Sequence, residues 1–176
     1  MEHGQHIAVI GAGLMGHGIA LTFARAGHIV TLTDPFSQAL TSAPKRIADS
    51  LRLLGADEPE IAATLARVTL APTTAEAVAN ASFVFEAAPE KLELKQAIFA
   101  EIEAHATADT ILASNTSVIQ ISKIMVGLKK RHRALGTHWW NPPHMIPLVE
   151  VVKTEWTDPV LAQTMFDLLA VAGKTP

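Results

Sequence analysis

The chain has 176 residues, 49% of them hydrophobic and 18% charged, which is enough for one well-buried core and too little for a second full domain. Its 14 Lys and Arg residues are outnumbered by 17 Asp and Glu residues, so no basic field exists to attract the phosphate backbone of a nucleic acid. The absence of cysteine excludes disulfides, Cys-ligated zinc, iron–sulfur clusters and thiolate nucleophiles; it is compatible with a reducing compartment, and we expect a cytoplasmic protein.

The first half of the chain alternates short apolar runs with longer helical patterns, as βαβ units around a parallel sheet do. Residues 7–10 and 29–33 predict buried strands, and residues 14–26 predict a helix that stops at Gly27. Helices over about 40–54 and 58–66 form an insertion before the next strand. The apolar stretch 7–19 is interrupted by His17 and is shorter than the ~20 residues of a membrane span.

The second half continues the same alternation. Strands are predicted at 68–70, 83–85 and 111–113, with a short helix near 75–79 and a longer helix that Pro89 opens and whose Leu94, Ile98 and Ile102 share one face. Residues 134–138 and 148–152 predict a hairpin-like or crossover pair of strands, and the last helix begins near Asp158. The expected fold is α/β: one Rossmann-type, doubly wound, mostly parallel sheet with a two-helix insertion, over residues 1–176.

Residues 11–16 read Gly-Ala-Gly-Leu-Met-Gly, a G-x-G-x-x-G pattern directly after a predicted strand and at the start of a predicted helix. In this pattern Gly11 permits a tight turn, Gly13 lets backbone N–H groups approach a pyrophosphate, and Gly16 allows the helix to pack closely on the strand. Leu14 and Met15 open the helix, whose N-terminus supplies partial positive charge. These five residues are candidate dinucleotide-binding residues.

Asp34 ends the second predicted strand, where it can accept hydrogen bonds from both ribose hydroxyls of a dinucleotide. A 2′-phosphate would meet its negative charge, and residues 35–38 contain no arginine to hold one, so NAD is favoured over NADP. A glycine turn followed by an ordinary capping aspartate is the plainer alternative. His17 and His28 flank this region without a partner at metal-ligand spacing, so we expect no metal site and surface positions for both.

His138 and Glu150 lie at the edges of the two paired strand-like runs, so the returning chain can bring them together as a His–carboxylate dyad. A turn histidine and an edge glutamate without a common role would give the same spacing. Asn115 and Ser117 follow the predicted strand 111–113, at the edge where open α/β sheets bind ligands, but they could equally cap the next segment.

Five segments have a distinctive sequence beyond their spacing. They are Gly-Ala-Gly-Leu-Met-Gly at 11–16, Glu-Ala-Ala-Pro-Glu at 86–90 with Lys95, Ser-Asn-Thr-Ser at 114–117, and Gly-Thr-His-Trp-Trp-Asn-Pro at 136–142 followed by Leu-Val-Glu-Val-Val at 148–152. Together they resemble the NAD-binding domain of the L-3-hydroxyacyl-CoA dehydrogenase family over essentially the whole chain.

The resemblance implies a role for each of these segments. His138 would be the catalytic acid/base, Glu150 its orienting partner, and Ser117 would lie near the reacting oxygen and the cofactor. The residues that would line the nicotinamide and ribose part of the site are Glu90, Lys95, Asn115 and Asn141. The implied reaction is reversible, NAD-dependent oxidation of the 3-hydroxyl of a 3-hydroxyacyl-CoA, part of fatty acid metabolism.

The resemblance also leaves alternatives open. Trp139-Trp140 stands where the family usually has Phe-Phe, and Asn-Pro-Pro at 141–143 with Pro-Leu-Val-Glu at 147–150 is similar to relatives that act on free hydroxy acids, such as the lambda-crystallin or gulonate dehydrogenase branch and carnitine dehydrogenase. In the family a helical C-terminal domain closes the cleft and forms a homodimer. We therefore expect this chain to be the cofactor-binding half.

Two further interpretations are weaker. The other β-hydroxyacid dehydrogenase family has a similar N-terminal pattern, but it uses a catalytic lysine and often NADP, which Asp34 and the pair of His138 and Glu150 disfavour. A non-catalytic NAD(H)-binding module is the alternative of another class. It requires no second domain, and an acetoacetyl-CoA reduction assay distinguishes it from an enzyme. For the enzyme we expect a small-molecule substrate, an acyl-CoA or a hydroxy acid, and neither a nucleic-acid nor a membrane partner.

Overall fold

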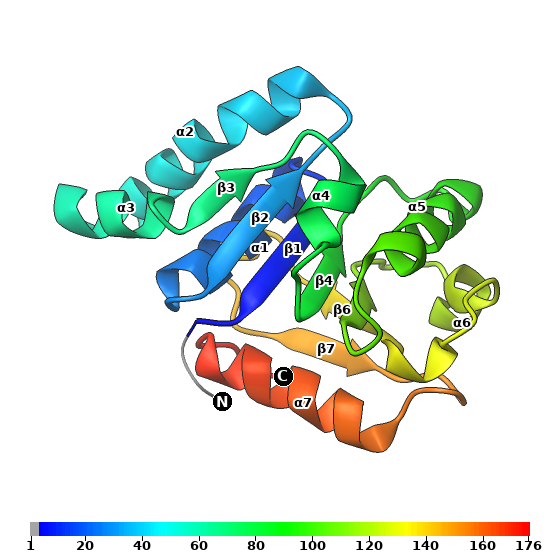
Figure 1. The fold of residues 1–176 in the computed structure, drawn as a ribbon. Coiled ribbons are helices and arrows are strands. Elements are labelled where there is room, and N and C mark those ends of the chain that lie inside the picture. Colours follow the sequence, from blue (N-terminus) through cyan, green and yellow to red (C-terminus); the bar gives the residue numbers. More distant parts are fainter. Residues whose placement is uncertain (1–3) are drawn as a thin grey trace.

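The computed structural model describes residues 4–176 and contains one seven-stranded sheet with the strand order β3-β2-β1-β4-β5-β6-β7 (Figure 1). β7 pairs antiparallel with β6, and all other neighbouring strands run parallel. The strands are β1 (His6–Ile10), β2 (Ile29–Thr33), β3 (Val68–Leu70), β4 (Phe83–Glu86), β5 (Ile111–Ser114), β6 (Ala134–Trp139) and β7 (Val149–Val152). The predicted doubly wound, mostly parallel sheet is confirmed.

Helices cover both faces of this sheet. The helices are α1 (Leu14–Arg25), α2 (Ser37–Leu53), α3 (Glu58–Leu65), α4 (Thr74–Val78), α5 (Leu92–His105), α6 (Ile121–Met125) and α7 (Pro159–Val171), with a 3-10 turn at Arg131–Arg133. Successive strand residues point to opposite faces, so Ile7 and Val9 pack against α1, α2, α3 and α7, whereas Ala8 and Ile10 pack against α4, α5 and α6. Among the described residues no helix is long and apolar enough to cross a bilayer.

The carboxyl ends of the parallel strands meet at one edge of the sheet. Ile10 at the end of β1 is in register with Thr33 of β2 on one side and with Glu86 of β4 on the other, and Glu86 is in register with Ser114 of β5. The chain winds away from β1 in both directions, which makes the edge beside Ile10 the switch point where open α/β sheets bind ligands.

Two helix predictions were wrong in their boundaries or faces. α5 begins at Leu92 rather than at Pro89, because Ala88 N–H donates to the Glu86 carboxylate and residues 87–91 run as a loop along the strand ends. Its buried residues are Lys95, Phe99 and Ile102, so the buried face is shifted by one residue from the predicted one. α2 begins at Ser37, three residues before the predicted start, after a turn in which Phe36 N–H donates to Asp34 Oδ1 over 2.8 Å.

The surface positions predicted for His17 and His28 were also wrong. His17 is 7% exposed and His28 is completely buried. The outer side of α1 is covered, because the His144 ring lies 6.2 Å from the His17 ring and an arginine of α2 reaches it. The His28 ring packs edge-on against Phe23 with ring centroids 6.0 Å apart. α6 was not predicted at all, since its single turn is too short to show a helical period.

Candidate active site

A cavity of about 520 Å³ opens at the carboxyl edge of β4, β5 and β6. Its lining comes from the start of α1, the loop after β4, the loop after β5 and the end of β6, namely Met15, residues 87–90, Asn115, Ser117 and residues 138–141. Residues that are far apart in the sequence therefore converge at the switch point of the sheet. Of the three residues predicted to be catalytic, His138 and Ser117 line the cavity and Glu150 does not.

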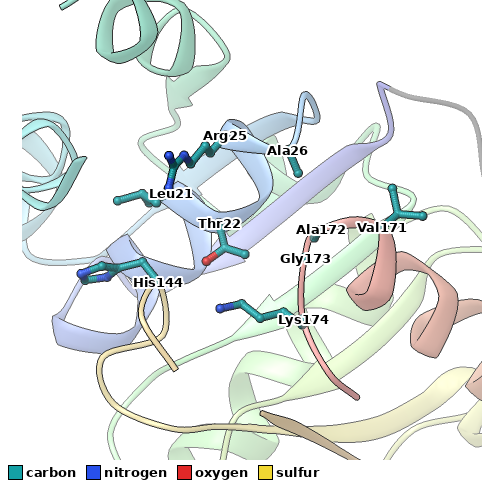
Figure 2. A pocket seen from close by; sticks show the side chains of 9 residues that line it. All are labelled: Leu21, Thr22, Arg25, Ala26, His144, Val171, Ala172, Gly173 and Lys174. Atoms are coloured by element: carbon teal, nitrogen blue, oxygen red, sulfur yellow. The ribbon is translucent and has the colours of Figure 1, made fainter. Parts of the chain in front are cut away.

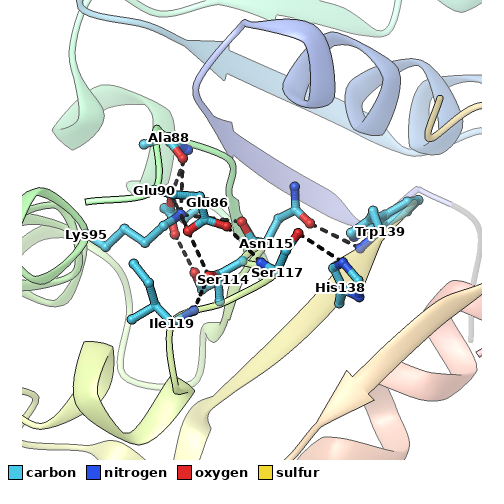
Figure 3. Close-up of polar contacts among 11 residues, drawn as sticks. Glu86, Ala88, Glu90, Lys95, Ser114, Asn115, Ser117, Ile119, His138 and Trp139 are labelled. Carbon is cyan, nitrogen blue, oxygen red and sulfur yellow. Dashed lines mark hydrogen bonds and ion pairs between the residues drawn. The ribbon is translucent and has the colours of Figure 1, made fainter. Parts of the chain in front are cut away.

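His138 and Glu150 are brought together by strand register. They are directly paired across β6 and β7, and His138 Nδ1 lies 2.5 Å from Glu150 Oε2. The other ring nitrogen, Nε2, lies 3.1 Å from the hydroxyl oxygen of Ser117 (Figure 3). A carboxylate at Nδ1 selects the tautomer with its hydrogen on Nδ1, so a lone pair at Nε2 faces the hydroxyl.

The loop after β5 is fixed by the loop after β4. One oxygen of the Glu90 carboxylate accepts a hydrogen bond from the Ser117 backbone N–H over 2.8 Å, and the other accepts from the Thr116 hydroxyl over 2.8 Å. Asn115 Oδ1 accepts from the Trp139 backbone N–H over 3.1 Å, which ties the end of β5 to the end of β6. Ser117 is thus held in place by its backbone, and its hydroxyl stays available to His138.

A buried charged layer lies beneath this surface (Figure 3). The Lys95 ammonium donates to Glu86 Oε1 over 2.7 Å, and the Ser114 hydroxyl donates to Glu86 Oε2 over 2.5 Å; both charged side chains are 0% exposed. Burial raises the pKa of the Glu86 carboxyl, and the positive charge of Lys95 opposes that rise. Lys95 also donates to the carbonyl oxygens of Ala88 and Asn115, so it supports two loops of the cavity from below.

The glycine-rich turn has the geometry that a dinucleotide requires. Gly11 has φ +102°, and a Cβ there would come within 2.8 Å of the Ala87 carbonyl oxygen. A Cβ on Gly16 would lie 1.7 Å from the Gly11 carbonyl oxygen, so this glycine allows α1 to pack on the turn. A Cβ on Gly13 would have no protein atom within 4 Å among the described residues, so at this glycine the turn presents bare backbone to open space.

The residues at this turn fit a pyrophosphate and a ribose. Gly13 is the N-cap of α1 and has no side chain to cap it, and the first turn carries no acidic residue, so its backbone N–H groups are available to an anion. Asp34 accepts one hydrogen bond from Ala12 N–H over 2.7 Å and one from Phe36 N–H over 2.8 Å. A carboxylate has about four lone-pair sites, so two remain for ribose hydroxyls.

Comparison with known proteins shows the family to which the chain belongs. Residues 6–176 match the family model for the 3-hydroxyacyl-CoA dehydrogenase, NAD binding domain. The chain belongs to this family. The mitochondrial hydroxyacyl-coenzyme A dehydrogenase of Homo sapiens is 35% identical over 181 residues, which cover 98% of this chain and 58% of that protein.

Two further members extend the comparison to another activity and to a solved structure. The L-carnitine dehydrogenase of Streptomyces griseus is 37% identical over 177 residues, covering 99% of this chain and 52% of that protein. The crystal structure of 3-hydroxybutyryl-CoA dehydrogenase from Escherichia coli superposes with a TM-score of 0.92 at 35% identity, covering 99% of this chain and 38% of the other. This 3-hydroxyacyl-CoA dehydrogenase NAD-binding domain thus spans about half the length of the curated relatives it matches.

Among the residues predicted for the site of this NAD-binding domain, the structure separates those on the cavity surface from those behind it. Met15, Glu90, Asn115, Ser117, His138 and Asn141 line the cavity. Lys95 does not, because its side chain is completely buried behind Ala88, and a direct contact with the cofactor would require that side chain to become exposed. Gly11, Gly13, Leu14, Gly16 and Asp34 form the adjoining turn and strand end.

Sequence reasoning missed two contributors to the lining and support of the cavity. Trp140, which is 48% exposed, lies next to His138 with ring centroids 5.5 Å apart, because both side chains leave the chain on the same side, two residues apart. Glu86 was noted only as part of a motif, yet it is the buried acceptor for Lys95. A strand that ends on a charged residue was the available signal, since burying that charge requires a partner.

A second cavity of about 330 Å³ lies between α1 and the segment after α7, where Figure 2 shows the side chains of Thr22, His144 and Lys174 around it. The Lys174 ammonium donates to the carbonyl oxygens of Pro143 over 2.5 Å and Ile146 over 3.0 Å. These two bonds fix the loop that joins β6 to β7, and the same loop carries Asn141 into the first cavity.

Proposed function

We propose that this chain is the cofactor-binding and proton-transfer half of an NAD-dependent dehydrogenase that reversibly oxidises the 3-hydroxyl of a 3-hydroxyacyl-CoA. The observation that carries the proposal is the line of contacts from Glu150 through His138 to the Ser117 hydroxyl, at the mouth of a cavity beside the glycine turn. Family membership supports the same activity, and the names of the mammalian relatives agree with it.

The residues of this chain would carry out the proton transfer of the reaction. His138 Nε2 would take the proton of the substrate hydroxyl, and Glu150 would stabilise the imidazolium that forms. The Ser117 hydroxyl would hold the reacting oxygen within reach of Nε2. NAD, when bound, supplies the hydride acceptor, and the glycine turn would hold its pyrophosphate. In the reverse direction the imidazolium would return the proton to the developing alkoxide.

The cofactor in this proposal is NAD rather than NADP. The Asp34 carboxylate would accept the hydroxyls of the adenosine ribose, and two backbone N–H groups fix the orientation of this carboxylate. A 2′-phosphate would place two negative charges in contact, which costs binding energy. A further hollow of about 400 Å³ beyond Asp34, lined by Ile10, Pro35 and the apolar side chains of Leu94 and Ile98, is a suitable place for the adenine ring.

A free hydroxy acid in place of the CoA thioester is the second candidate substrate. Similarity to L-carnitine dehydrogenase at 37% identity supports it, as do Asn-Pro-Pro at 141–143 and Pro147 in the loop between β6 and β7. The proposal extends to the rest of the protein: a helical domain completes the substrate side of the cleft and forms a homodimer in the cytoplasm, although some relatives are mitochondrial.

The test combines binding with turnover. NADH is titrated by its fluorescence, and oxidation of NADH is followed with acetoacetyl-CoA and, in the reverse direction, NAD reduction is followed with L-carnitine as the free hydroxy acid. We expect acetoacetyl-CoA-dependent turnover that the His138→Gln substitution abolishes while NADH binding remains. Turnover with the free acid alone would select the second candidate. In a protein that also contains the proposed helical domain, NADH binding without any turnover would overturn the enzymatic proposal and leave an NAD(H)-binding module.

A further inference from the structure

An arginine of the two-helix insertion reaches across to the glycine-rich turn. Arg46, on α2, donates through Nη2 to the carbonyl oxygens of Ala12 over 2.5 Å and Ala39 over 2.7 Å, and through Nη1 to the carbonyl oxygen of Gly13 over 3.2 Å. Its Nη1 also lies 3.2 Å from His17 Nδ1. One guanidinium therefore holds two successive carbonyl groups of the turn.

Because the peptide bond is planar, holding these two carbonyl groups also fixes the direction of the N–H group in each of the two peptide units. In a trans peptide the N–H points away from the carbonyl oxygen of the same unit. The carbonyls of Ala12 and Gly13 point toward Arg46, so the N–H groups of Gly13 and Leu14 point away from it. The backbone at Gly13 is also open, since a Cβ placed there would have no described protein atom within 4 Å.

Arg46 also adds charge at this position. Its terminal nitrogens donate to the carbonyl oxygens of Ala12, Gly13 and Ala39, and no ion pair within residues 4–176 joins it to a carboxylate. Its positive charge adds to the partial positive charge at the N-terminus of α1. The pKa of His17 is lowered, first by burial and further by the positive charge of Arg46.

We propose that Arg46 is a cofactor-positioning residue that holds the N–H groups of Gly13 and Leu14 toward the pyrophosphate of NAD(H) and increases the attraction of the turn for that anion. The inference rests on the proposed function only in that the chain binds NAD(H). It assigns part of the cofactor affinity to the helical insertion, whose residues the glycine fingerprint does not include.

The chain offers a matched control. Arg67 is a half-buried arginine that also donates to backbone carbonyls, to Ala63 O over 3.1 Å and Ala24 O over 3.4 Å, and its bonds join α3 to the end of α1 remote from the turn. Replacing Arg67 measures the effect of losing an arginine that joins two helices. Replacing Arg46 measures the same kind of loss together with the loss of the contacts that position the N–H groups of Gly13 and Leu14.

The experiment measures the dissociation constants of NADH and of ADP-ribose, which keeps the pyrophosphate but lacks nicotinamide, for the full chain and for R46M, R46K and R67M. Circular dichroism and thermal melts are recorded for each. We expect R46M to weaken both ligands about tenfold or more, because hydrogen bonds to a charged group are lost. R46K should fall in between, since one ammonium keeps the charge but cannot hold both carbonyls in a fork. R67M should change neither dissociation constant by more than about twofold, within the range of surface effects.

A folded R46M with the wild-type dissociation constants overturns the inference, and so does an equal loss in R67M. If R46M does not fold, R46K decides: wild-type affinity in R46K overturns the positioning role. The wild-type titration separates this inference from the proposed function. NADH binding without turnover, in a protein that also contains the proposed helical domain, contradicts the enzymatic proposal while the comparison of variants still stands. Absence of NADH binding by the wild-type chain contradicts both.

Discussion

His138 Nδ1 lies 2.5 Å from Glu150 Oε2 because the two residues are register partners across β6 and β7, the antiparallel pair of the sheet. A parallel β7 would carry Glu150 to the other end of the sheet after a long crossover connection. The reversal of the chain between β6 and β7 is therefore what builds the dyad, and the same reversal leaves residues 140–148 as a loop whose Trp140 and Asn141 line the cavity.

The first prediction concerns the Glu150→Gln variant. The amide introduced by this substitution can still accept a hydrogen bond from Nδ1, but it cannot stabilise a positive imidazolium, so we expect turnover to fall by about 10²–10⁴-fold, the usual contribution of acid–base help. The dissociation constant of NADH should stay within about twofold, because Glu150 is half-exposed and lies outside the cavity lining. Steady-state kinetics and a fluorescence titration measure the two quantities; unchanged turnover would contradict the dyad.

The second prediction compares two glycines of the same turn. Gly16→Ala places a Cβ 1.7 Å from the Gly11 carbonyl oxygen, so the free energy of unfolding should drop by about 1–3 kcal/mol or more. Gly13→Ala meets no described protein atom within 4 Å and has φ −70°, so the fold should keep its thermal midpoint. NADH binding should nonetheless be lost in Gly13→Ala, because the methyl group would occupy the space of the pyrophosphate. A folded Gly13→Ala with unchanged affinity would place the cofactor elsewhere.

The sequence predicts the sheet and the cofactor turn well for a physical reason. A strand, a glycine pattern and an acid at the end of the next strand are local signals, and each depends on backbone geometry that few residues satisfy. The buried pair of Glu86 and Lys95 and the role of Arg46 could not be predicted, because both depend on contacts between elements far apart in the chain. The surface position predicted for His17 was wrong for the same reason, because the sequence of its own helix does not indicate which distant segments cover it.

The third prediction concerns the buried pair beneath the cavity. Lys95→Met leaves the Glu86 carboxyl completely buried without its cation, and breaking such a pair costs about 3–5 kcal/mol of the free energy of unfolding. The double variant Glu86→Gln, Lys95→Met removes both charges and should be less destabilised than Lys95→Met alone. Denaturant unfolding of the two single variants and the double variant measures the coupling. Additive losses would show that the two side chains contribute independently.

The fourth prediction concerns acidification. Burial lowers the pKa of His17 and of His144 below the ordinary imidazole value of about 6.5. Between 6.5 and the lowered values the unfolded chain binds more protons than the folded chain, so the free energy of unfolding falls as the pH drops through this window. The raised pKa of Glu86 acts in the opposite direction above its ordinary range, because there the folded chain holds the extra proton.

Single variants isolate the histidine contribution in thermal melts between pH 8 and 5. The wild-type midpoint should fall on acidification below about pH 6.5. His17→Gln should lose stability less steeply, since it removes one group that must stay neutral in the fold. His105→Gln is the control, because His105 is exposed at the end of α5 and should keep the wild-type slope. A His17→Gln slope equal to that of the wild type would show that this imidazole titrates alike in the folded and unfolded chain.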